Sequence, residues 1–561
     1  MTKSDIQHRL KLTVLLILAF ASVGFLLFSY AEDSPLHFFA GLVFAASFVW
    51  IMLKWKVRAE QPGFTDYDYS ESTDARWCSK QEFDDTNNPD RQSNRDYWIG
   101  GRFTRCKPAH YTVLGGSGLG KTTALLIPNF LIRPSGSMVG VDIKGELAYT
   151  TIRAMLEYNQ VVKLIDPLRM QDEMGARHGV KPCGFNVFDF ILKNPDEILD
   201  TCASIAYYLC PDVPGTKDTY WIERSRGLIK TILAHIATAK KPEERNLFTL
   251  YKLLRLPSVE FTNLLIDMKN NKKLDGLISI AAQEWLGMED AGATMAGILS
   301  NAQNNTAFLE SAALRDCLSR SDFDPYSLSR DGNVTLYICI PDRFMDTHVA
   351  FLRLVVGLCL KACNTKPNAN VRFFLDEFPM MKKMIDVQRN FAFGRGQNIE
   401  LSIYAQSITA LRDIYGESWE SFLANSAVIQ AFGGQRDLAT QKYISELCGK
   451  RTVIKGNRSN GTSTSKDGST KTTSTSYSTE KQPLITAEEI SRMDDSIITI
   501  CDGRKAVLQN LPYYKNIYEN VDANSEGLTD EERETLRNGG KLVDEFYEGF
   551  MKKADIPLNF M

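Results

Sequence analysis

The sequence predicts an α/β fold in which a parallel sheet carries a glycine-rich loop and a helical block is inserted between the strands. Three observations predict it. Between residues 110 and 166, short apolar runs alternate with helical stretches, which is the rhythm of consecutive βαβ units. A glycine-rich segment directly follows the first apolar run. Strand-like runs vanish between about 185 and 330 and return from residue 334.

The composition is that of a globular protein. Of the 561 residues, 44% are hydrophobic and 24% are charged, which permits a large core and excludes wholesale disorder. The net charge of -3 excludes a protein that is basic throughout, so any contact with nucleic acid must be local. Eleven cysteines are scattered without a C-x-x-C pair, which favours a reducing compartment over a disulfide scaffold.

Two uncharged apolar runs, at 12–30 and 35–53, predict a membrane anchor over residues 1–58. Each run is long enough as a helix, about 28 Å, to span a bilayer. Lysines and arginines flank the outer ends, and the turn at 31–34 is acidic. The positive-inside rule then places both termini in the cytoplasm. The alternative for the first run is a cleaved signal peptide.

Strands are expected wherever a short apolar run is bounded by polar or glycine-containing segments. These runs are 111–115, 137–143, 161–167, 334–340, 371–376, 401–406, 427–432 and 496–503. Apolar residues at helical spacing predict a helix over 220–239. Residues 60–107 are interpreted as a linker with irregular structure, and the Phe-Gly-Gly-Gln segment at 432–435 as a strand-to-helix turn.

The strongest chemical signal is a G-x4-G-K-[ST] motif that begins at Gly115, between a strand-like run and a helical run. Its glycines let backbone N–H groups surround phosphate oxygens, and the following helix N-terminus adds partial positive charge. Lys121 is expected to reach the β- and γ-phosphates, and the Thr122 hydroxyl to ligate Mg²⁺. The expected ATP-binding residues are Gly115, Gly116, Ser117, Gly118, Leu119, Gly120, Lys121, Thr122 and Thr123.

An apolar run that ends in Asp376 and Glu377 has the form of a Walker B element. Asp376 is expected in the Mg²⁺ shell, and Glu377 is expected to polarise the attacking water as general base. A strand that merely ends in two solvated acids is the alternative. The presence of the glycine-rich motif favours the Walker B interpretation.

Two further residues are candidates for catalysis. Gln406 ends the next apolar run, where it could sense the γ-phosphate and position water; a solvated strand-end amide is the alternative. Arg395 stands between Gly394 and Gly396 and could act as an arginine finger on a neighbour's ATP. The alternative is a helix C-terminal cap with one of these two glycines in the left-handed conformation.

These signals divide the chain beyond the anchor into three parts. Residues 59–184 and 331–518 form the nucleotide-binding domain, and residues 185–330 form an inserted all-α domain. The Ser/Thr-rich tract at 453–483 cannot bury a core and is expected to be a flexible loop. Residues 519–561 form an acidic C-terminal extension of one or two surface helices.

Several blocks go beyond a generic phosphate-binding loop. They are 140–149 (GVDIKGELAY), 184–189 (GFNVFD), 319–328 (SRSDFDPYSL), 373–381 (FFLDEFPMM), 405–416 (AQSITALRDIYG) and 482–490 (QPLITAEEI). Through them the chain, from the paired apolar runs to about residue 514, resembles the coupling proteins of type IV secretion and conjugation, the TraG/TraD-like family.

The resemblance implies a membrane-anchored homo-hexameric ATPase of the bacterial inner membrane, with a RecA-like P-loop NTPase domain and an inserted all-α domain. Such a protein brings relaxase-bound DNA or effector proteins to the secretion channel and uses ATP and Mg²⁺. The resemblance also implies that Asp142 and Lys144 line the nucleotide site, and it supports Gln406 more than Arg395. Relatives often carry a longer periplasmic segment than the turn at 31–34.

Two other functions remain open at this point. One is a docking receptor whose ATP site mainly sets oligomerisation. The other is an FtsK-like DNA translocase, against which the two apolar runs and the acidic tail count. Basic residues of the inserted block permit DNA contact but fit an ordinary solvated helix face equally well; they are Arg224, Arg226, Lys230, Lys240 and Lys241.

Overall fold

The computed structural model describes residues 74–78, 96–99, 103–105, 110–132, 134–213, 215, 219–289, 292–365, 368–465, 468–501, 506–510 and 530–553. The two membrane spans expected at 12–30 and 35–53 lie outside the described residues. Among the helices that the structure describes, none is both long and apolar enough to cross a bilayer.

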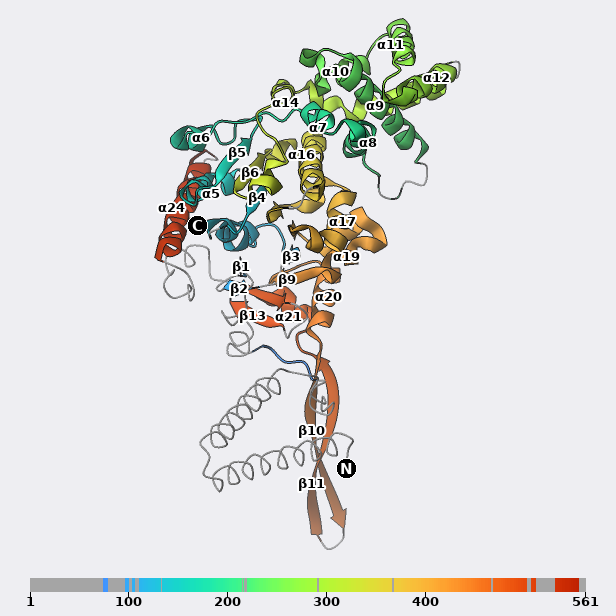
Figure 1. The fold of residues 1–561 in the computed structure, drawn as a ribbon. Helices are drawn as coiled ribbons and strands as arrows, with labels where there is room; N and C mark the ends of the chain where they lie inside the picture. Colours follow the sequence, from blue (N-terminus) through green and yellow to red (C-terminus); the bar gives the residue numbers. More distant parts are fainter. Residues whose placement is uncertain are drawn as a thin grey trace, which may run out of the picture. The chain divides into compact units, whose positions relative to one another are not determined.

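A nine-stranded sheet forms the centre of the described chain (Figure 1). Its strands follow the order β13 (Val507–Asn510), β12 (Ser496–Cys501), β9 (Ser426–Phe432), β3 (His110–Leu114), β8 (Ile399–Ala405), β7 (Val371–Leu375), β4 (Ser137–Asp142), β6 (Val334–Cys339) and β5 (Val161–Ile165). The strands from β9 to β5 run parallel, and β12 and β13 are antiparallel at one edge. Continuous apolar runs suit these strands, because helices cover both faces.

Each face of the sheet has its own core. On one face lie α4 (Ile127–Leu131), α5 (Glu146–Glu157) and α24 (Asp530–Lys553). On the other lie α16 (Met345–Thr365), α17 (Ile385–Phe393) and α18 (Ile408–Tyr415). Figure 1 shows α24 alongside α5. The acidic extension therefore contributes a helix to the nucleotide-binding side of the fold.

The segment between β5 and β6 is helical, as the inserted all-α block requires. Its helices are α6 (Asp172–His178), α7 (Val187–Lys193), α8 (Ile198–Leu209), α9 (Tyr220–Ala239), α10 (Leu247–Leu253), α11 (Ser258–Asn270), α12 (Leu277–Glu289), α13 (Gly292–Asn305), α14 (Ala312–Cys317) and α15 (Ser327–Asp331). The buried residues of α8 and α9 belong to the same core as those of α16. The block is thus packed onto the sheet domain without an intervening gap.

Close contacts join α8 to α16 and to α17, which carries Asp386. The Tyr208 hydroxyl donates a hydrogen bond to Asp386 (2.5 Å), and the Arg353 side chain donates to the Tyr208 carbonyl (3.0 Å). Gly357 lies under the Tyr208 ring, where an added Cβ would stand 2.5 Å from a ring carbon. The absence of a side chain at this point lets the two helices approach each other.

The tract at 453–483, expected to be a loop, forms paired β-strands in the structure. Residues Lys450–Ser465 (β10) and Gly468–Pro483 (β11) pair as a long antiparallel hairpin. These strands pair only with each other among the described strands. The polar composition excludes a buried core, but it does not exclude strand pairing, because threonine is β-branched and both faces of a hairpin can be solvated.

The linker expected at 60–107 also contains regular structure. β1 (Asp96–Trp98) pairs with β2 (Phe103–Arg105), and the Trp98 side chain is buried. The turn expected at 432–435 joins β9 to α20 (Leu438–Cys448) as predicted. Short helices α19 (Glu420–Ala424) and α21 (Ala487–Arg492) complete the domain.

Replacing Gly357 with alanine tests the contact between the helical block and the sheet domain. Alanine forms helices better than glycine, but here its Cβ would collide with the Tyr208 ring. We expect a loss of about 1–3 kcal/mol in unfolding free energy, measured by denaturant titration. The matched control is Gly287→Ala in α12, where an added Cβ meets nothing within 4 Å. That variant should gain up to about 1 kcal/mol, and equal effects of the two changes would contradict the packing described.

Candidate nucleotide site

The glycine-rich loop follows β3 and leads into a helix. Gly118 and Gly120 have φ of 80° and 85°, a left-handed conformation that glycine adopts without strain. A Cβ added at Gly118 would meet nothing within 4 Å, so this side of the loop is open. The Ala124 N–H donates to the Gly120 carbonyl (2.8 Å), and a π-helical turn over Thr122–Leu126 leads into α4. The loop and helix end therefore have the form of a phosphate cradle.

Lys121 lies folded over the loop. Its ammonium donates hydrogen bonds to the carbonyls of Gly115 (2.8 Å) and Gly116 (3.2 Å). The same nitrogen lies 3.7 Å from a carboxylate oxygen of Glu377. Lys121 is only 5% exposed, so its charge acts at short range on the open side of the loop. The structure thus brings two of the predicted site residues into direct contact.

Thr122 faces the Walker B strand. Its hydroxyl lies 3.5 Å from an oxygen of Asp376, which follows the end of β7. In the sheet, β8 separates β7 from the loop-bearing strand β3. Burial, together with the nearby carboxylates of Glu377 and Glu146, raises the pKa of Asp376 to about 6 against the opposing effect of Lys121. The ionised form of Asp376 is therefore unfavourable by itself and would be stabilised by a bound cation.

Gln406 occupies the gap between the two motifs. It follows β8, and its side-chain amide donates to Glu377 (3.3 Å). Gln435, in the turn after β9, donates in turn to the Gln406 carbonyl (2.9 Å). Glu377 itself has a left-handed backbone, with φ of 45°, which is uncommon for a residue with a side chain and is often found at functional sites. The prediction of Gln406 at the site agrees with this geometry.

Arg395 is not near its own loop. It lies in a short 3-10 helix over Gly394–Gln397 that precedes β8, whereas Gln406 follows the same strand. A strand of 7 residues separates the two ends by roughly 20 Å. The alternative of a cap with one of these glycines in the left-handed conformation is not what the structure shows, since Gly394 has φ of -66° and Asn398 takes the left-handed position with φ of 56°. The backbone of Arg395 thus lies at the other end of β8 from the phosphate loop of its own chain.

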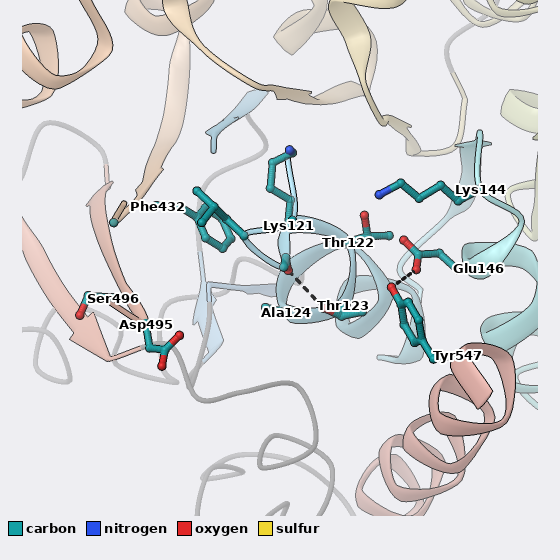
Figure 2. A pocket seen from close by; sticks show the side chains of 14 residues that line it. Lys121, Thr122, Thr123, Ala124, Lys144, Glu146, Phe432, Asp495, Ser496 and Tyr547 are labelled. Atoms are coloured by element: carbon teal, nitrogen blue, oxygen red, sulfur yellow. Dashed lines mark hydrogen bonds between the residues drawn. The ribbon is translucent and has the colours of Figure 1, made fainter. Parts of the chain in front are cut away.

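A cavity of about 330 Å³ opens beside the loop. Figure 2 shows Thr122, Lys144, Glu146 and Tyr547 on one side and Phe432, Asp495 and Ser496 on the other. Lys144 is exposed and lines this cavity, as the resemblance implies.

Asp142 has another role. Its carboxylate accepts hydrogen bonds from the N–H groups of Gly145 (2.7 Å) and Ala148 (2.8 Å) and so caps α5. Burial raises its pKa to about 7 in spite of these bonds. It does not line the cavity; it fixes the start of the helix that carries the lining residue Glu146.

Sequence reasoning missed two supports of the site. Trp98 donates from its indole to the Ala124 carbonyl (2.8 Å), and Asn129 bridges both backbone groups of Trp98. Together they fix the helix that follows the loop. Tyr547, on α24, reaches the cavity and donates to Glu146. Neither support belongs to a motif, although the isolated tryptophan in a polar segment was a usable signal for the first.

The basic residues of the helical block are largely engaged within it. Arg224 pairs with Glu284 (2.8 Å) and lies over the Trp285 ring. Arg226 pairs with Asp212 (2.7 Å), and Lys240 lies 3.8 Å from Asp267. These three basic side chains are therefore engaged with acidic side chains, as on an ordinary solvated helix face.

The residues present fit Mg²⁺ only as part of a nucleotide complex. Thr122 and Asp376 supply the hydroxyl and carboxylate oxygens that this hard cation prefers. Within the described residues, no group of three or more histidines, cysteines or acids could hold a metal by itself. Such a small protein contribution is typical of Mg²⁺ that phosphates and water also bind.

The family model for "Type IV secretory system Conjugative DNA transfer" matches residues 70–538. The chain belongs to this family. Among relatives, the type IV secretion system-coupling protein VirD4 of Bartonella quintana is 26% identical over 407 residues, covering 69% of this chain and 60% of its own length. A probable conjugal transfer protein TraG of Sinorhizobium fredii is 25% identical and covers 70% of this chain and 60% of its own length. The chain thus spans 60% of the length of these relatives.

Solved structures support the fold. The conjugative coupling protein TrwBdeltaN70 superposes with a TM-score of 0.59 at 16% identity, covering 78% of this chain and 92% of that chain. TrwB in complex with ADPNP, a non-hydrolysable ATP analogue, gives 0.58 at 15% identity, covering 78% of this chain and 93% of that chain. The predicted fold class is confirmed: a RecA-like P-loop NTPase domain with an inserted all-α block.

The raised pKa of Asp376 predicts a pH-dependent cost to stability. Its folded-state pKa of about 6 lies above the ordinary value of 3.8 for an aspartate, so the folded chain holds this proton more tightly. The resulting stability is full below about pH 4 and is lost as the pH rises through about 6. We expect Asp376→Asn to raise the unfolding free energy at pH 7.5 by on the order of 2 kcal/mol, measured without nucleotide.

The gain from Asp376→Asn should shrink toward pH 4.5, where the wild-type carboxyl is itself protonated. The control is Asp331→Asn, since that carboxyl is paired with Arg330 at the surface and its pKa is lowered. A gain from Asp376→Asn that does not change between pH 4.5 and 7.5 would contradict a buried, destabilising charge.

Proposed function

We propose that the chain is an ATPase of a type IV secretion system, anchored in the bacterial inner membrane, that couples ATP hydrolysis to substrate transfer. The supporting observation is that Lys121 and Gln406 both meet Glu377. The Lys121 ammonium lies 3.7 Å from one carboxylate oxygen of Glu377, and the Gln406 amide donates to the other at 3.3 Å. Membership of the conjugative DNA transfer family supports the secretion role.

In this proposal the loop and Lys121 bind the β- and γ-phosphates of ATP. Bound Mg²⁺ neutralises phosphate charge, and Thr122 and Asp376 are the residues that would hold it. Glu377 accepts a proton from the attacking water, and Gln406 orients Glu377 through its amide. The Lys121 contacts with the Gly115 and Gly116 carbonyls keep the ammonium in place until phosphate oxygens replace them.

The proposed assembly is a homo-hexamer attached to the membrane through the spans at 12–30 and 35–53. Substrate, either relaxase-bound DNA or an effector protein, is delivered by it to the channel components. A ring would complete the nucleotide site, because a single P-loop domain leaves the γ-phosphate open on one side, where a neighbouring subunit can contact it. Arg395 precedes β8 and so lies at the amino ends of the strands, whereas the phosphate loop lies at their carboxyl ends. It is proposed to complete the site of a neighbouring subunit.

Lys121→Ala tests nucleotide binding. We expect it to abolish ATP turnover and substrate transfer, because the charge that holds the phosphates is gone, while membrane insertion is retained. Purified protein should be assayed for ATP hydrolysis and for retention of ADPNP with Mg²⁺. The control is Lys181→Ala, an exposed lysine outside the cavity. Full transfer by Lys121→Ala would remove the proposal.

Glu377→Gln separates a motor from a docking receptor. Hydrolysis should fall by about 10²–10⁴, because glutamine cannot take the proton from water, while ATP remains bound. Transfer should fall with hydrolysis if ATP drives it. If hydrolysis stops and transfer persists, the receptor role with a structural ATP site is correct instead.

Mixed subunits test the action of Arg395 in another copy. Lys121→Ala and Arg395→Ala chains should each be inactive alone, since an arginine finger contributes about 10³–10⁵ in rate. In mixtures, a site with intact Lys121 can receive Arg395 from a Lys121→Ala neighbour. ATPase activity should therefore recover in part, and no recovery at any mixing ratio would exclude this role.

A further inference from the structure

The C-terminal helix α24 is anchored close to the nucleotide cavity. Leu536 and Val543 are buried in the core shared with α4 and α5. Gly539 abuts Leu131, where an added Cβ would stand 2.3 Å from a methyl carbon. Arg177 pairs with Glu545 at 3.0 Å. These contacts fix the middle of α24 against the sheet domain.

Tyr547 is the residue of α24 that lines the cavity. Its hydroxyl donates a hydrogen bond of 2.5 Å to one carboxylate oxygen of Glu146, and both residues line the cavity (Figure 2). Glu146 begins α5 and is 2% exposed. Its carboxylate is therefore oriented by a residue 401 positions away in sequence.

The second oxygen of Glu146 is the unusual feature. Oε1 is buried and has no hydrogen-bond partner among the described residues. A buried carboxylate oxygen without a partner is costly, and such groups are satisfied when a cation or a water molecule binds.

We propose that Glu146 is a further residue of the Mg²⁺-nucleotide site, whose unpartnered oxygen would accept a hydrogen bond from water bound to the metal, and that Tyr547 is the residue that positions it. The inference rests on the proposed ATP binding at Thr122 and Asp376 and assigns part of that site to the C-terminal helix. Metal binding and the docking of α24 are then coupled through one hydrogen bond. The ammonium of Lys144, in the same wall, balances the added negative charge.

Tyr547→Phe tests the positioning role, because it removes the hydroxyl and keeps the ring. The purified full-length chain should be titrated with Mg²⁺ at a fixed concentration of ADPNP. We expect the Mg²⁺ concentration at half-saturation to rise about tenfold, the usual effect of losing a partner that orients a metal-site group. Binding of ADPNP in EDTA should be unchanged.

Two further variants separate this role from general packing. Glu146→Gln keeps an oxygen to accept from Tyr547 but loses the charge, so it should also weaken Mg²⁺ while α24 stays docked. The matched control is Tyr149→Phe, a second tyrosine at the α5–α24 contact, whose ring packs against Phe546 and which does not line the cavity. Its Mg²⁺ dependence should equal that of the wild type.

Hydrogen exchange in α24 gives a readout independent of metal affinity. In the wild type, Mg²⁺ with ADPNP should slow exchange over 530–553 by several-fold, and Tyr547→Phe should abolish that slowing. Wild-type Mg²⁺ dependence in both Tyr547→Phe and Glu146→Gln would overturn this inference alone. Failure of the wild-type chain to bind Mg²⁺-ADPNP at all would overturn the proposed function as well.

Discussion

The site depends on the parallel alignment of β3, β8 and β7. Because these strands run in one direction, their carboxyl ends meet at one edge, and the residues that follow them are brought together. Lys121 and Glu377, which belong to the two separate sequence segments of the domain, thus come within 3.7 Å. The strand between them, β8, is followed by Gln406, whose side-chain amide donates to Glu377.

The second requirement is burial. Asp376 is 4% exposed and Lys121 is 5% exposed, so their charges are little screened by water and are strong at short range. The raised pKa of Asp376 is the stability cost of holding an acid in this place. The buried carboxylate destabilises the folded chain when no ligand is bound, and a bound cation would offset that cost. Perturbed groups of this kind are common at functional sites.

Those parts of the site that belong to short local motifs could be predicted from the sequence. Lys121, Thr122, Asp376 and Glu377 each follow an apolar run at a recognisable spacing, and the strands themselves were found by their apolar character. Pairing partners far apart in sequence could not be predicted. Tyr547 reaches Glu146 across 401 positions without a motif. The hairpin of β10 and β11 could not be predicted either, because a polar tract indicates only that no core is buried and leaves strand pairing open.

The shared core of α8, α9 and α16 limits how a machine built from this chain could produce force. An all-α block on a hinge could swing by itself, but this block is continuous with the apolar interior beneath the sheet. Tyr208, pressed against Gly357, leaves no room for sliding at that point. If the chain works in the proposed ring, this packing favours movement between neighbouring copies, each as one unit, over movement of the helical block within one copy.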